Sequence, residues 1–329
     1  MKAMVLTQFG DVSNFTLTDI PTPDLRPGTV LIDVKAASVN PVDYKVRQNG
    51  PGFANPLPAP LGLDVAGTIR AVAPDITGFA VGDAVYGCAG GIAGETGTNA
   101  EIMRADARLI APMPVNLSFR EAAALPLVSI TAIEALERLG VGVGTRLLVI
   151  GGTGGVGHIA VQLAAARGAI VDSTASTLEK SMLAKSFGAR EVISYRTETI
   201  AEGAARLTQG EGYDCVLDAT GGSDIASAFA AARLNGQVAT IVSHYTADLA
   251  PMHVKGLSLH VIFMLIPLIH NRGREQHRAW LRDLKTLVEA GRVKPFLDPQ
   301  HFALADLAAA HTHLESGQAV GKVVIDIAD

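Results

Sequence analysis

A glycine-rich turn between an apolar run and a helix-forming segment constrains the fold of this chain more than any other feature. Residues 147–157 read Leu-Leu-Val-Ile-Gly-Gly-Thr-Gly-Gly-Val-Gly, and residues 158–167 have helical composition. Gly152, Gly154 and Gly157 have the G-x-G-x-x-G spacing, between a predicted strand and a predicted helix, that dinucleotide sites require. The spacing predicts a tight turn at Gly152, close approach of a pyrophosphate at Gly154, and close packing of helix on strand at Gly157.

The start of the predicted helix should attract phosphate groups. Free backbone N–H groups and the positive end of the helix dipole both favour anions at this position. We therefore expect a dinucleotide to bind along the turn, which also includes Thr153, Gly155 and Val156. The alternative is a glycine-rich strand-to-helix turn without a ligand.

Composition excludes several classes of protein. The 329 residues are enough for two domains with cores of their own. Apolar residues make up 48% and charged residues 18%, which indicates a folded protein. The formal charge of −5 and the lack of a dense Lys/Arg run give no electrostatic support for binding to nucleic acid or a membrane surface.

Cysteine content and apolar runs indicate a cytoplasmic protein. Cys88 and Cys215 are the only cysteines, too few for a disulfide framework and typical of a reducing compartment. Cys215 lies in an apolar run and is expected in the core. The first residues lack the long apolar segment of a signal peptide, and the apolar run 257–269 is too short to span a bilayer. We interpret that run as a buried or interface element.

The sequence pattern of the chain changes near residue 120. Before it, short β-rich runs such as 30–39, 67–73 and 83–86 alternate with turn residues. After it, Ala-rich helical segments alternate with apolar strands, which favours a doubly wound parallel sheet. The expected helices are 120–139, 155–167, 178–187 and 223–233, and the expected strands are 146–150, 169–174, 191–194, 213–218 and 237–242. Helices near 275–290 and 305–315 and a strand at 322–327 follow, and we expect that strand to return to the first domain.

Six segments occur in an order that resembles one known family. They are 39–45, 60–67, 78–83, 124–132, 151–157 and 314–323. Across nearly its whole length the chain resembles the medium-chain dehydrogenase/reductase superfamily, and within it the zinc-independent quinone oxidoreductase branch that includes enone and alkenal reductases. The resemblance implies an α/β protein: a GroES-like β-rich catalytic domain (1–121 and 268–329) and a Rossmann domain (122–267).

The residues argue against zinc. A catalytic zinc needs about three Cys, His or carboxylate ligands, and a structural zinc usually needs four. Asn40 stands where the zinc-dependent relatives have a cysteine, and Leu63-Asp64 replaces their His-Glu pair. His311 and His313 lie two apart in a predicted helix, where side chains diverge, so we interpret them as surface residues.

The end of the second Rossmann strand favours NADPH over NADH. An NAD site has a carboxylate there for the ribose 2′-hydroxyl, and Asp172 lies about 20 residues past Gly152. We expect the strand to continue beyond Asp172, which places Ala175 at the acidic position. Hydroxyls and a cation suit a 2′-phosphate; Ser176, Thr177 and Lys180 supply them, and the resemblance adds Tyr195. The alternative is that Lys180 is merely solvated and Tyr195 merely packs.

Without a metal, the protein must position the substrate and stabilise developing negative charge. The resemblance implies Tyr44 or Lys45 as the donor to a quinone or enone oxygen, and Asn40 as a partner of the nicotinamide ribose or the substrate. Many quinone reductases have Thr-Tyr where this chain has Tyr44-Lys45. The alternatives are that Asn40-Pro41 starts a turn, that Asp43 caps a short helix or orients Lys45, and that Lys45 faces solvent.

The resemblance also implies further cofactor contacts. Thr131 matches a position beside the nicotinamide, and the turn 218–222 matches one near the adenosine ribose. Ser243 ends the next strand, and Ile262 and Phe263 would line the nicotinamide side. The glycine-rich loop 88–98 is either a lid or a turn. The contacts expected here are Thr131, Asp218, Ser243 and Phe263.

These features predict a cytoplasmic, NADPH-dependent reductase of quinones or α,β-unsaturated carbonyls. The alternatives are an NADH-using alcohol or aldehyde oxidoreductase and a non-catalytic NADPH-binding sensor. We also expect a homodimer formed through Rossmann edge strands, to which the apolar run 257–269 is suited.

Overall fold

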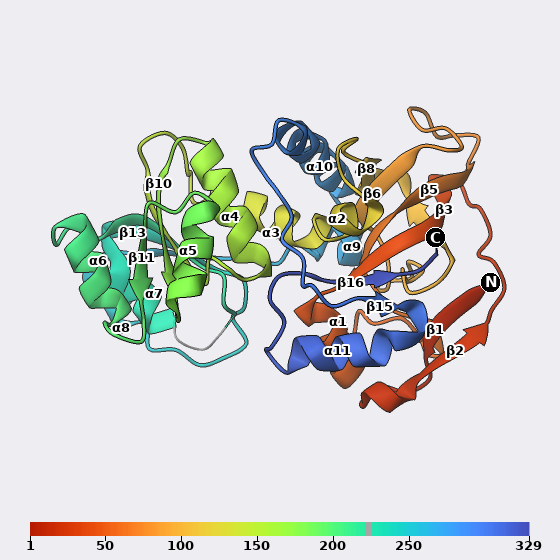
Figure 1. Cartoon of the computed structure of the whole chain (residues 1–329), viewed down its shortest axis with the longest axis horizontal. Coiled ribbons are helices and arrows are strands. Elements are labelled where there is room, and N and C mark those ends of the chain that lie inside the picture. Colours follow the sequence, from red (N-terminus) through yellow and green to blue (C-terminus); the bar gives the residue numbers. More distant parts are fainter. Residues whose placement is uncertain (222–224, 329) are drawn as a thin grey trace. The chain divides into compact units, whose positions relative to one another are not determined.

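The computed structural model describes residues 1–221 and 225–328, and it divides into two compact units (Figure 1). Unit 1 comprises Met1–Leu127 and Leu265–Asp329, and unit 2 comprises Val128–Met264. The chain leaves unit 1 within one helix and returns to it after the last strand of unit 2.

Unit 1 is built on β-strands, and the strand expectations for 30–39, 67–73 and 83–86 are confirmed. A seven-stranded sheet has the order β15-β16-β3-β5-β6-β8, with β7 paired to β3, and a smaller sheet has the order β2-β1-β4. The strands are β1 (Lys2–Leu6), β2 (Phe15–Asp19), β3 (Thr29–Val39), β4 (Ala59–Pro60), β5 (Asp64–Val72), β6 (Ala84–Cys88), β7 (Ile102–Asp106), β8 (Ile110–Pro112), β15 (Phe302–Ala303) and β16 (Val323–Asp326).

The last strand returns to the first unit, as expected. β16 pairs antiparallel with β3, and Val323 lies opposite Val39. Because the residues flanking a paired position are neighbours in space, this register brings Lys322 beside Asn40, although the two are far apart in sequence.

A short helix starts directly after β3. Asn40 is the N-cap of α1 (Pro41–Asn49), Pro41 occupies the first helical position and Asp43 completes a capping box. Gly50 ends the helix in the left-handed conformation, with φ of 51°. The other unit 1 helices are α2 (Phe119–Ala123), α9 (Ile266–His270), α10 (Arg274–Glu289) and α11 (Leu307–Glu315), with 3₁₀ turns at Val12–Asn14, Ala107–Leu109 and Leu304–Asp306.

The single helix predicted for 120–139 is wrong, because the chain forms two. Ser118 and Glu121 form a capping box that starts α2, and α3 (Pro126–Arg138) begins afresh at Pro126. Proline lacks a backbone N–H and disfavours helical geometry in the residue before it, so the helix breaks before Pro126. α3 starts in unit 1 and continues into unit 2.

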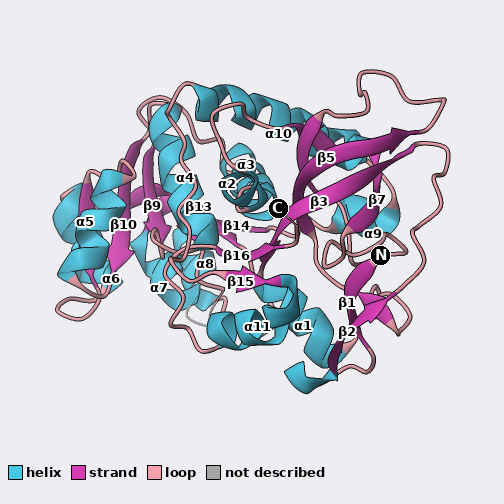
Figure 2. Cartoon of the chain, turned by 45° about the vertical axis from the view of Figure 1, so that its right-hand side comes forward, coloured by secondary structure: helices cyan, strands magenta, loops and turns pink. Residues whose placement is uncertain are grey.

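Unit 2 confirms the predicted doubly wound sheet (Figure 2). Its six strands have the order β11-β10-β9-β12-β13-β14, and all neighbours pair in parallel, which is the order of a Rossmann fold. The strands are β9 (Arg146–Ile150), β10 (Ile170–Ala175), β11 (Glu191–Ser194), β12 (Tyr213–Asp218), β13 (Ala232–Thr240) and β14 (Ser258–Val261), and the helices are α4 (Gly155–Ala166), α5 (Leu178–Ser186), α6 (Ile200–Thr208), α7 (Ile225–Ala231) and α8 (Ala250–Lys255).

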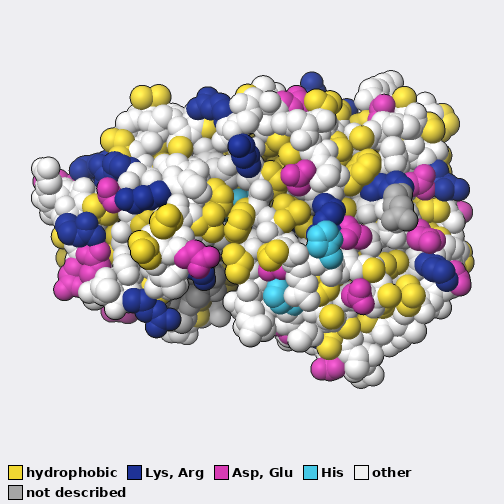
Figure 3. All heavy atoms as spheres, viewed as in Figure 1, with side chains coloured by type: hydrophobic (Ala, Val, Ile, Leu, Met, Phe, Trp, Pro, Cys, Tyr) yellow, Lys and Arg dark blue, Asp and Glu magenta, His cyan; other side chains and the backbone are white. Residues whose placement is uncertain are grey.

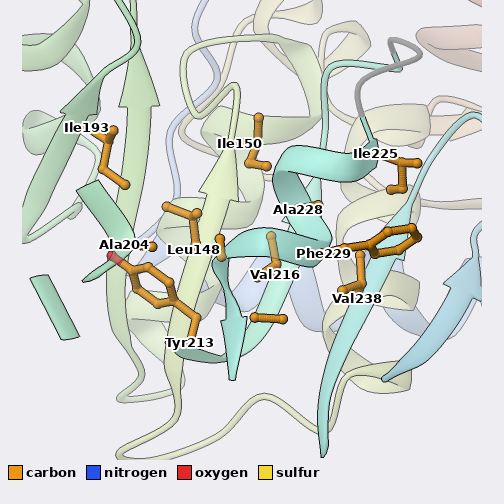
Figure 4. Close-up of a cluster of buried hydrophobic side chains, with 12 residues drawn as sticks. Leu148, Ile150, Ile193, Ala204, Tyr213, Val216, Ile225, Ala228, Phe229 and Val238 are labelled. Carbon is orange, nitrogen blue, oxygen red and sulfur yellow. The ribbon is translucent and has the colours of Figure 1, made fainter. Parts of the chain in front are cut away.

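One face of this sheet packs against α6 and α7 (Figure 4). Leu148, Val216 and Val238 come from adjacent strands, and Phe229 packs on them from α7. Each of these four side chains is fully buried, and burial of an apolar side chain of this size stabilises the fold by about 1.5–3 kcal/mol. This core fixes the strand ends that carry the predicted cofactor contacts.

The region after β12 differs in detail from expectation. The helix predicted at 223–233 is α7, and residues 222–224 lie outside the described part of the chain. β13 starts earlier and ends earlier than the predicted strand 237–242. The apolar run 257–269 forms an edge strand, β14, followed by α9.

Surface charge is mixed on the face drawn in Figure 3, where Lys and Arg side chains alternate with Asp and Glu. Along the described ranges, no helix combines the length and apolar character needed to cross a bilayer.

Candidate functional site

The glycine turn between β9 and α4 has the predicted geometry, with one change of role. Gly151, and not Gly152, adopts the left-handed conformation, with φ of 80°. Gly152 is needed for a close approach: a Cβ there would lie 2.0 Å from Ser173 Oγ, which is itself bonded to the Val149 carbonyl. Gly152 lies within the turn, as expected, but its close approach to β10 is what requires glycine there.

Gly157 and Gly154 differ in what surrounds them. A Cβ on Gly157 would lie 2.1 Å from the Gly151 carbonyl oxygen, which confirms the expected close packing of helix on strand. Gly154 is exposed, and a Cβ there would come no closer than 3.4 Å to its nearest neighbour, Gly151. The backbone at Gly154 is thus open to a ligand. Thr153, Gly155 and Val156 complete the turn, and their contacts with a cofactor stay predictions.

The Asp172 carboxylate is hydrogen-bonded to other residues of unit 2. The strand continues to Ala175, as expected, and the Asp172 carboxylate is fully buried. It accepts two bonds from the Arg190 guanidinium, at 3.0 and 2.6 Å, and one from the Tyr213 hydroxyl at 2.8 Å. Asp172 is therefore not the carboxylate of an NAD ribose site, and Ala175 ends the strand.

The residues predicted to hold a 2′-phosphate lie after two neighbouring strand ends. Ala175 pairs with Ser194 at the ends of β10 and β11, and the backbone N–H of Tyr195 donates to the Ala175 carbonyl at 3.3 Å. Ser176 follows β10, and Thr177 caps α5 by accepting from the backbone N–H of Lys180 at 3.2 Å. Because the ends of adjacent parallel strands meet at one edge, these side chains share that edge of the sheet.

The described residues do not neutralise the positive charge of Lys180 at this edge. Lys180 is exposed, and no ion pair to it occurs among residues 1–221 and 225–328. Tyr195 is 49% exposed. A free ammonium beside two hydroxyls and a phenol is suited to a phosphate group, so the edge fits the 2′-phosphate prediction, which stays a prediction.

The other expected cofactor residues are dispersed over unit 2. The Asp218 carboxylate ends β12 and accepts from the Thr220 N–H and hydroxyl and the Thr240 hydroxyl, at 3.1, 2.6 and 3.2 Å. Thr131 is nearly buried on α3, and Phe263, after β14, is 40% exposed. Gly222 of the predicted turn lies outside the described residues.

A cavity of about 260 Å³ borders the carboxyl end of β13. Ser243, which is exposed, lines it together with Phe229, Tyr245 and Leu259. The lining is mainly apolar with a few hydroxyls, as is common in ligand cavities.

In unit 1, Asn40 belongs to a buried polar network. Its Nδ2 donates to Asp64 Oδ2 at 2.8 Å, and its Oδ1 accepts from the Lys322 ammonium. Lys322 Nζ also lies 3.7 Å from Asp64 Oδ2, and Ser38 Oγ donates to the same oxygen at 2.8 Å. Asn40 and Asp64 are fully buried and Lys322 is 4% exposed. The expected contact of Asn40 with a cofactor or substrate stays a prediction.

Burial and charge act against each other in this network. Burial raises the pKa of Asp64 and lowers the pKa of Lys322, and their mutual attraction opposes both shifts. Asp64 Oδ1 accepts the backbone N–H of Leu127 at 2.9 Å. One carboxylate therefore ties α1, β3, the residue before β16 and the first turn of α3 together.

Asp43 caps α1, as one alternative anticipated. Its Oδ2 accepts the backbone N–H of Asn40 at 2.7 Å, and its Oδ1 has no partner in the described part of the chain. Burial, and secondarily the Asp64 charge, raise the pKa of Asp43 to about 7. Because Asp43 is buried and Lys45 is exposed, Asp43 holds the helix start and does not orient Lys45.

Tyr44 has a hydroxyl without a hydrogen-bond partner among the described residues. The side chain is partly buried, and no hydrogen bond to its hydroxyl occurs within residues 1–221 and 225–328. Burial, and secondarily the Glu315 carboxylate, raise the pKa of the phenol. The Tyr44 phenol is therefore protonated at neutral pH, and Lys45 next to it is exposed to solvent.

Across the described residues, no three His, Cys, Asp or Glu side chains lie close enough to share a metal ion. The prediction that His311 is a surface residue is wrong. His311 is fully buried and its ring meets Phe15 edge-on at 5.1 Å, because this face of α11 packs on the unit 1 core. His313 is bonded to Asp298 at 3.0 Å.

The loop 88–98 is a packed turn and not an open flap. A Cβ on Gly97 would lie 2.2 Å from the Pro60 carbonyl oxygen, and Glu95 forms an ion pair with Arg274 at 2.6 Å. Most residues from Cys88 to Asn99 are buried.

The sequence did not predict that Asp64 and Lys322 belong to the buried network. Lys322 was assigned only to a strand, and Asp64 only to a replaced metal position. A lysine placed directly before the apolar run 323–325 was the available signal, since lysines are almost never fully buried without a partner.

Comparison with known proteins agrees with this architecture. Residues 26–115 match the family model for the alcohol dehydrogenase GroES-like domain, and residues 187–325 match the model for zinc-binding dehydrogenases. The chain is 34% identical to the 2-methylene-furan-3-one reductase of Solanum lycopersicum over 99% of its own length and 79% of that protein. It is also 34% identical to the chloroplastic NADPH-dependent alkenal/one oxidoreductase of Arabidopsis thaliana, with the same coverage.

The fold has a close counterpart among solved structures. The crystal structure of an alcohol dehydrogenase superfamily protein from Novosphingobium aromaticivorans matches with a TM-score of 0.94 and 37% identity, covering 100% of both chains. A GroES-like unit and a Rossmann unit with a dinucleotide turn define an oxidoreductase of the medium-chain dehydrogenase/reductase type. Within that superfamily, the chain belongs to the quinone oxidoreductase and enone reductase branch.

Proposed function

We propose that this chain is a metal-free, NADPH-dependent reductase that transfers a hydride to quinones or α,β-unsaturated carbonyl compounds. The observation that carries the proposal is the network of Asn40, Asp64 and Lys322. Asn40 stands where zinc-dependent relatives have a cysteine, and Asp64 belongs to the pair that replaces their His-Glu. Here the two side chains bond to one another and to the Lys322 ammonium. The relatives named for alkenal/one and furanone reduction support the substrate class.

The residues present fit NADPH. The open backbone at Gly154 would receive the pyrophosphate, and Gly152 and Gly157 permit the close packing behind it. Lys180, with Ser176, Thr177 and Tyr195, would hold the 2′-phosphate. A carboxylate at the end of β10 would repel the phosphate, and Ala175 supplies none there.

The substrate class follows from how charge is stabilised. When bound, the dinucleotide would supply a hydride from its nicotinamide ring. Negative charge then develops on the substrate oxygen, and a hydrogen-bond donor is enough to stabilise it when the charge is delocalised over an enone or quinone. The Tyr44 phenol would donate a proton to that oxygen. Lys45 is the second candidate for that donation.

The quaternary structure and location are part of the same proposal. β14 is an edge strand with Val261 43% exposed, and such an edge offers unpaired backbone groups to a second copy of the chain. We propose a homodimer on this ground. Both cysteines are free and buried, which supports a reducing, cytoplasmic location.

NADPH oxidation followed at 340 nm tests the function. The assay would use 1,2- and 1,4-quinones, enones and enals, and would be repeated with NADH and with a chelator. Chelator-insensitive turnover that prefers NADPH is expected. Tight NADPH binding without turnover of any acceptor would contradict the enzyme and favour a sensor, and chelator-sensitive alcohol oxidation would contradict the metal-free mechanism.

A further inference from the structure

Helix α1, which carries Tyr44, is held by charged groups at both ends. At its start, the Asn40 side chain is bonded to Asp64 and Lys322. At its other end, two side chains of α1 donate to the carboxylate of Glu315, the last residue of α11. The Arg47 guanidinium contacts Oε1, and Gln48 Nε2 donates to Oε2 at 2.7 Å.

The contacts of Glu315 lie on the face of α1 that presents Tyr44. Arg47 and Gln48 follow Tyr44 by three and four positions, so the three side chains share one face of the helix. The Arg47 side chain is only 3% exposed, and it also donates to the Gly10 carbonyl. The carboxylate is thus bonded to residues one helical turn from Tyr44, and its charge contributes to the raised pKa of the phenol, after burial.

The position of Glu315 is unfavourable for α11 itself. Glu315 is the last residue of that helix, and a negative charge is destabilising at a helix C-terminus. The bonds to α1 offset this cost. The carboxylate therefore acts on α1 and not as a cap of its own helix.

We propose that Glu315 is a positioning residue for Tyr44: by binding Arg47 and Gln48 it fixes the helix face that presents the phenol. The inference rests on the proposed function, in which Tyr44 donates the proton. It adds a residue from a distant segment of the chain, α11, that holds the helix carrying this donor.

The charges around the phenol are consistent with this role. On α1, Arg47 is paired with Glu315, and Lys45 is exposed to solvent. On α11, burial and secondarily Arg47 lower the pKa of His311 to about 3, so His311 is neutral at the pH of the assay. Glu315 is the group whose charge raises the pKa of Tyr44, beside the effect of burial.

The test measures the titration of Tyr44 directly. Absorbance of tyrosinate near 295 nm is followed against pH in the full chain, and the same titration of Tyr44→Phe is subtracted to isolate one phenol. Glu315→Gln retains an acceptor for Arg47 or Gln48 but removes the charge. We expect Tyr44 to ionise at lower pH in Glu315→Gln than in the unsubstituted protein, and the alkaline limb of kcat to move in the same direction.

Glu289→Gln is the matched control, because Glu289 is likewise the last residue of a helix and is paired with a lysine, Lys285. We expect it to leave the Tyr44 titration unchanged. Glu315→Asp, which keeps the charge, should restore the titration. An unchanged Tyr44 titration in Glu315→Gln would overturn the inference.

The two proposals fail in different ways. If Tyr44→Phe retains full kcat, the donor role is wrong, whereas the effect of Glu315 on the phenol can still be read from absorbance. If Glu315→Gln does not fold, Gln48→Ala replaces it, since it loosens the same carboxylate from a more exposed site. A lower ionisation pH is again expected, and no change would overturn the inference.

Discussion

The ammonium of Lys322 contacts the side-chain oxygen of Asn40 inside unit 1, across 282 positions of sequence. The Asn40 amide nitrogen donates in turn to Asp64. The register of β16 against β3 makes this contact possible, since Val323 lies opposite Val39. A cation from the end of the chain thus neutralises a carboxylate near its start.

Removing this cation should destabilise unit 1. Lys322→Met leaves the fully buried Asp64 carboxylate without a counter-charge, and breaking a buried pair costs about 3–5 kcal/mol. Urea unfolding should show this loss, and adding Asp64→Asn should recover part of it. Lys185→Met, which breaks an exposed pair with Glu191, should cost less than about 1 kcal/mol. Equal costs for the two lysines would contradict the prediction.

Cofactor preference should reverse with two substitutions at one sheet edge. Ala175→Asp combined with Lys180→Ala introduces a ribose-binding carboxylate and removes the phosphate-binding cation. We expect the ratio of NADPH to NADH affinity to fall at least about tenfold, which corresponds to ~1.4 kcal/mol. Fluorescence titration measures both affinities, and Lys185→Ala on the same helix is the control. An unchanged preference for NADPH would remove the assignment.

Two glycines of the same turn should respond differently to alanine. Gly157→Ala would force a Cβ to 2.1 Å from the Gly151 carbonyl oxygen, and such overpacking costs about 1–3 kcal/mol. Gly154→Ala meets nothing closer than 3.4 Å, so Tm should hold while NADPH binding weakens. Thermal unfolding and cofactor titration separate the two effects. Equal Tm values for both variants would contradict the packing argument.

Stability should fall in mild acid because of His311. The imidazole is buried, and its two ring nitrogens have no partners in the described part of the chain; its pKa is about 3 in the folded state against an unfolded value of 6.5. The neutral form is therefore favoured on folding. Its contribution is complete above pH 6.5 and is lost as the pH falls towards 3, at up to ~1.4 kcal/mol per pH unit.

Urea unfolding at pH 7.5 and pH 5 measures this loss. His311→Leu should show a smaller difference between the two pH values than the unsubstituted protein. His301→Gln, at an exposed position in the same unit, should keep the full difference. A His311→Leu variant with undiminished acid sensitivity would show that other groups are responsible.

Association should depend on the free edge of the unit 2 sheet. Light scattering at low micromolar concentration is expected to give the mass of a dimer. Val261→Lys places a charge on β14, which blocks strand pairing between copies, and should give a monomer with unchanged Tm. A monomeric unsubstituted chain would refute the dimer.

The regular parts of the fold could be predicted because they are encoded locally. Alternating Ala-rich and apolar segments predicted the parallel sheet, and strands 191–194 and 213–218 were placed correctly to the residue. The break at Pro126 was missed because the apolar pattern continues across it. His311 was misplaced because only the packing of α11 decides which of its faces is buried.

The candidate site was predictable only where its residues are contiguous in sequence. The glycine turn and the residues after β10 are contiguous with the elements that position them. The polar network of unit 1 joins residues from β3, β5 and the segment before β16. No local pattern specifies which polar side chains such long-range pairing brings together, so Lys322 and Glu315 emerge only from the three-dimensional arrangement.

The inward orientation of Asp172 bears on how cofactor use can evolve in this chain. An acid already stands about one βα unit beyond the glycine turn, yet Arg190 and Tyr213 retain it inside the sheet. Mutation of Arg190 would leave the buried Asp172 carboxylate without its counter-charge. It would not bring the carboxylate to the ribose, because β10 continues for three residues beyond Asp172. A lineage that switches to NADH therefore gains nothing from its existing acid, and selection must act on the small residue at position 175.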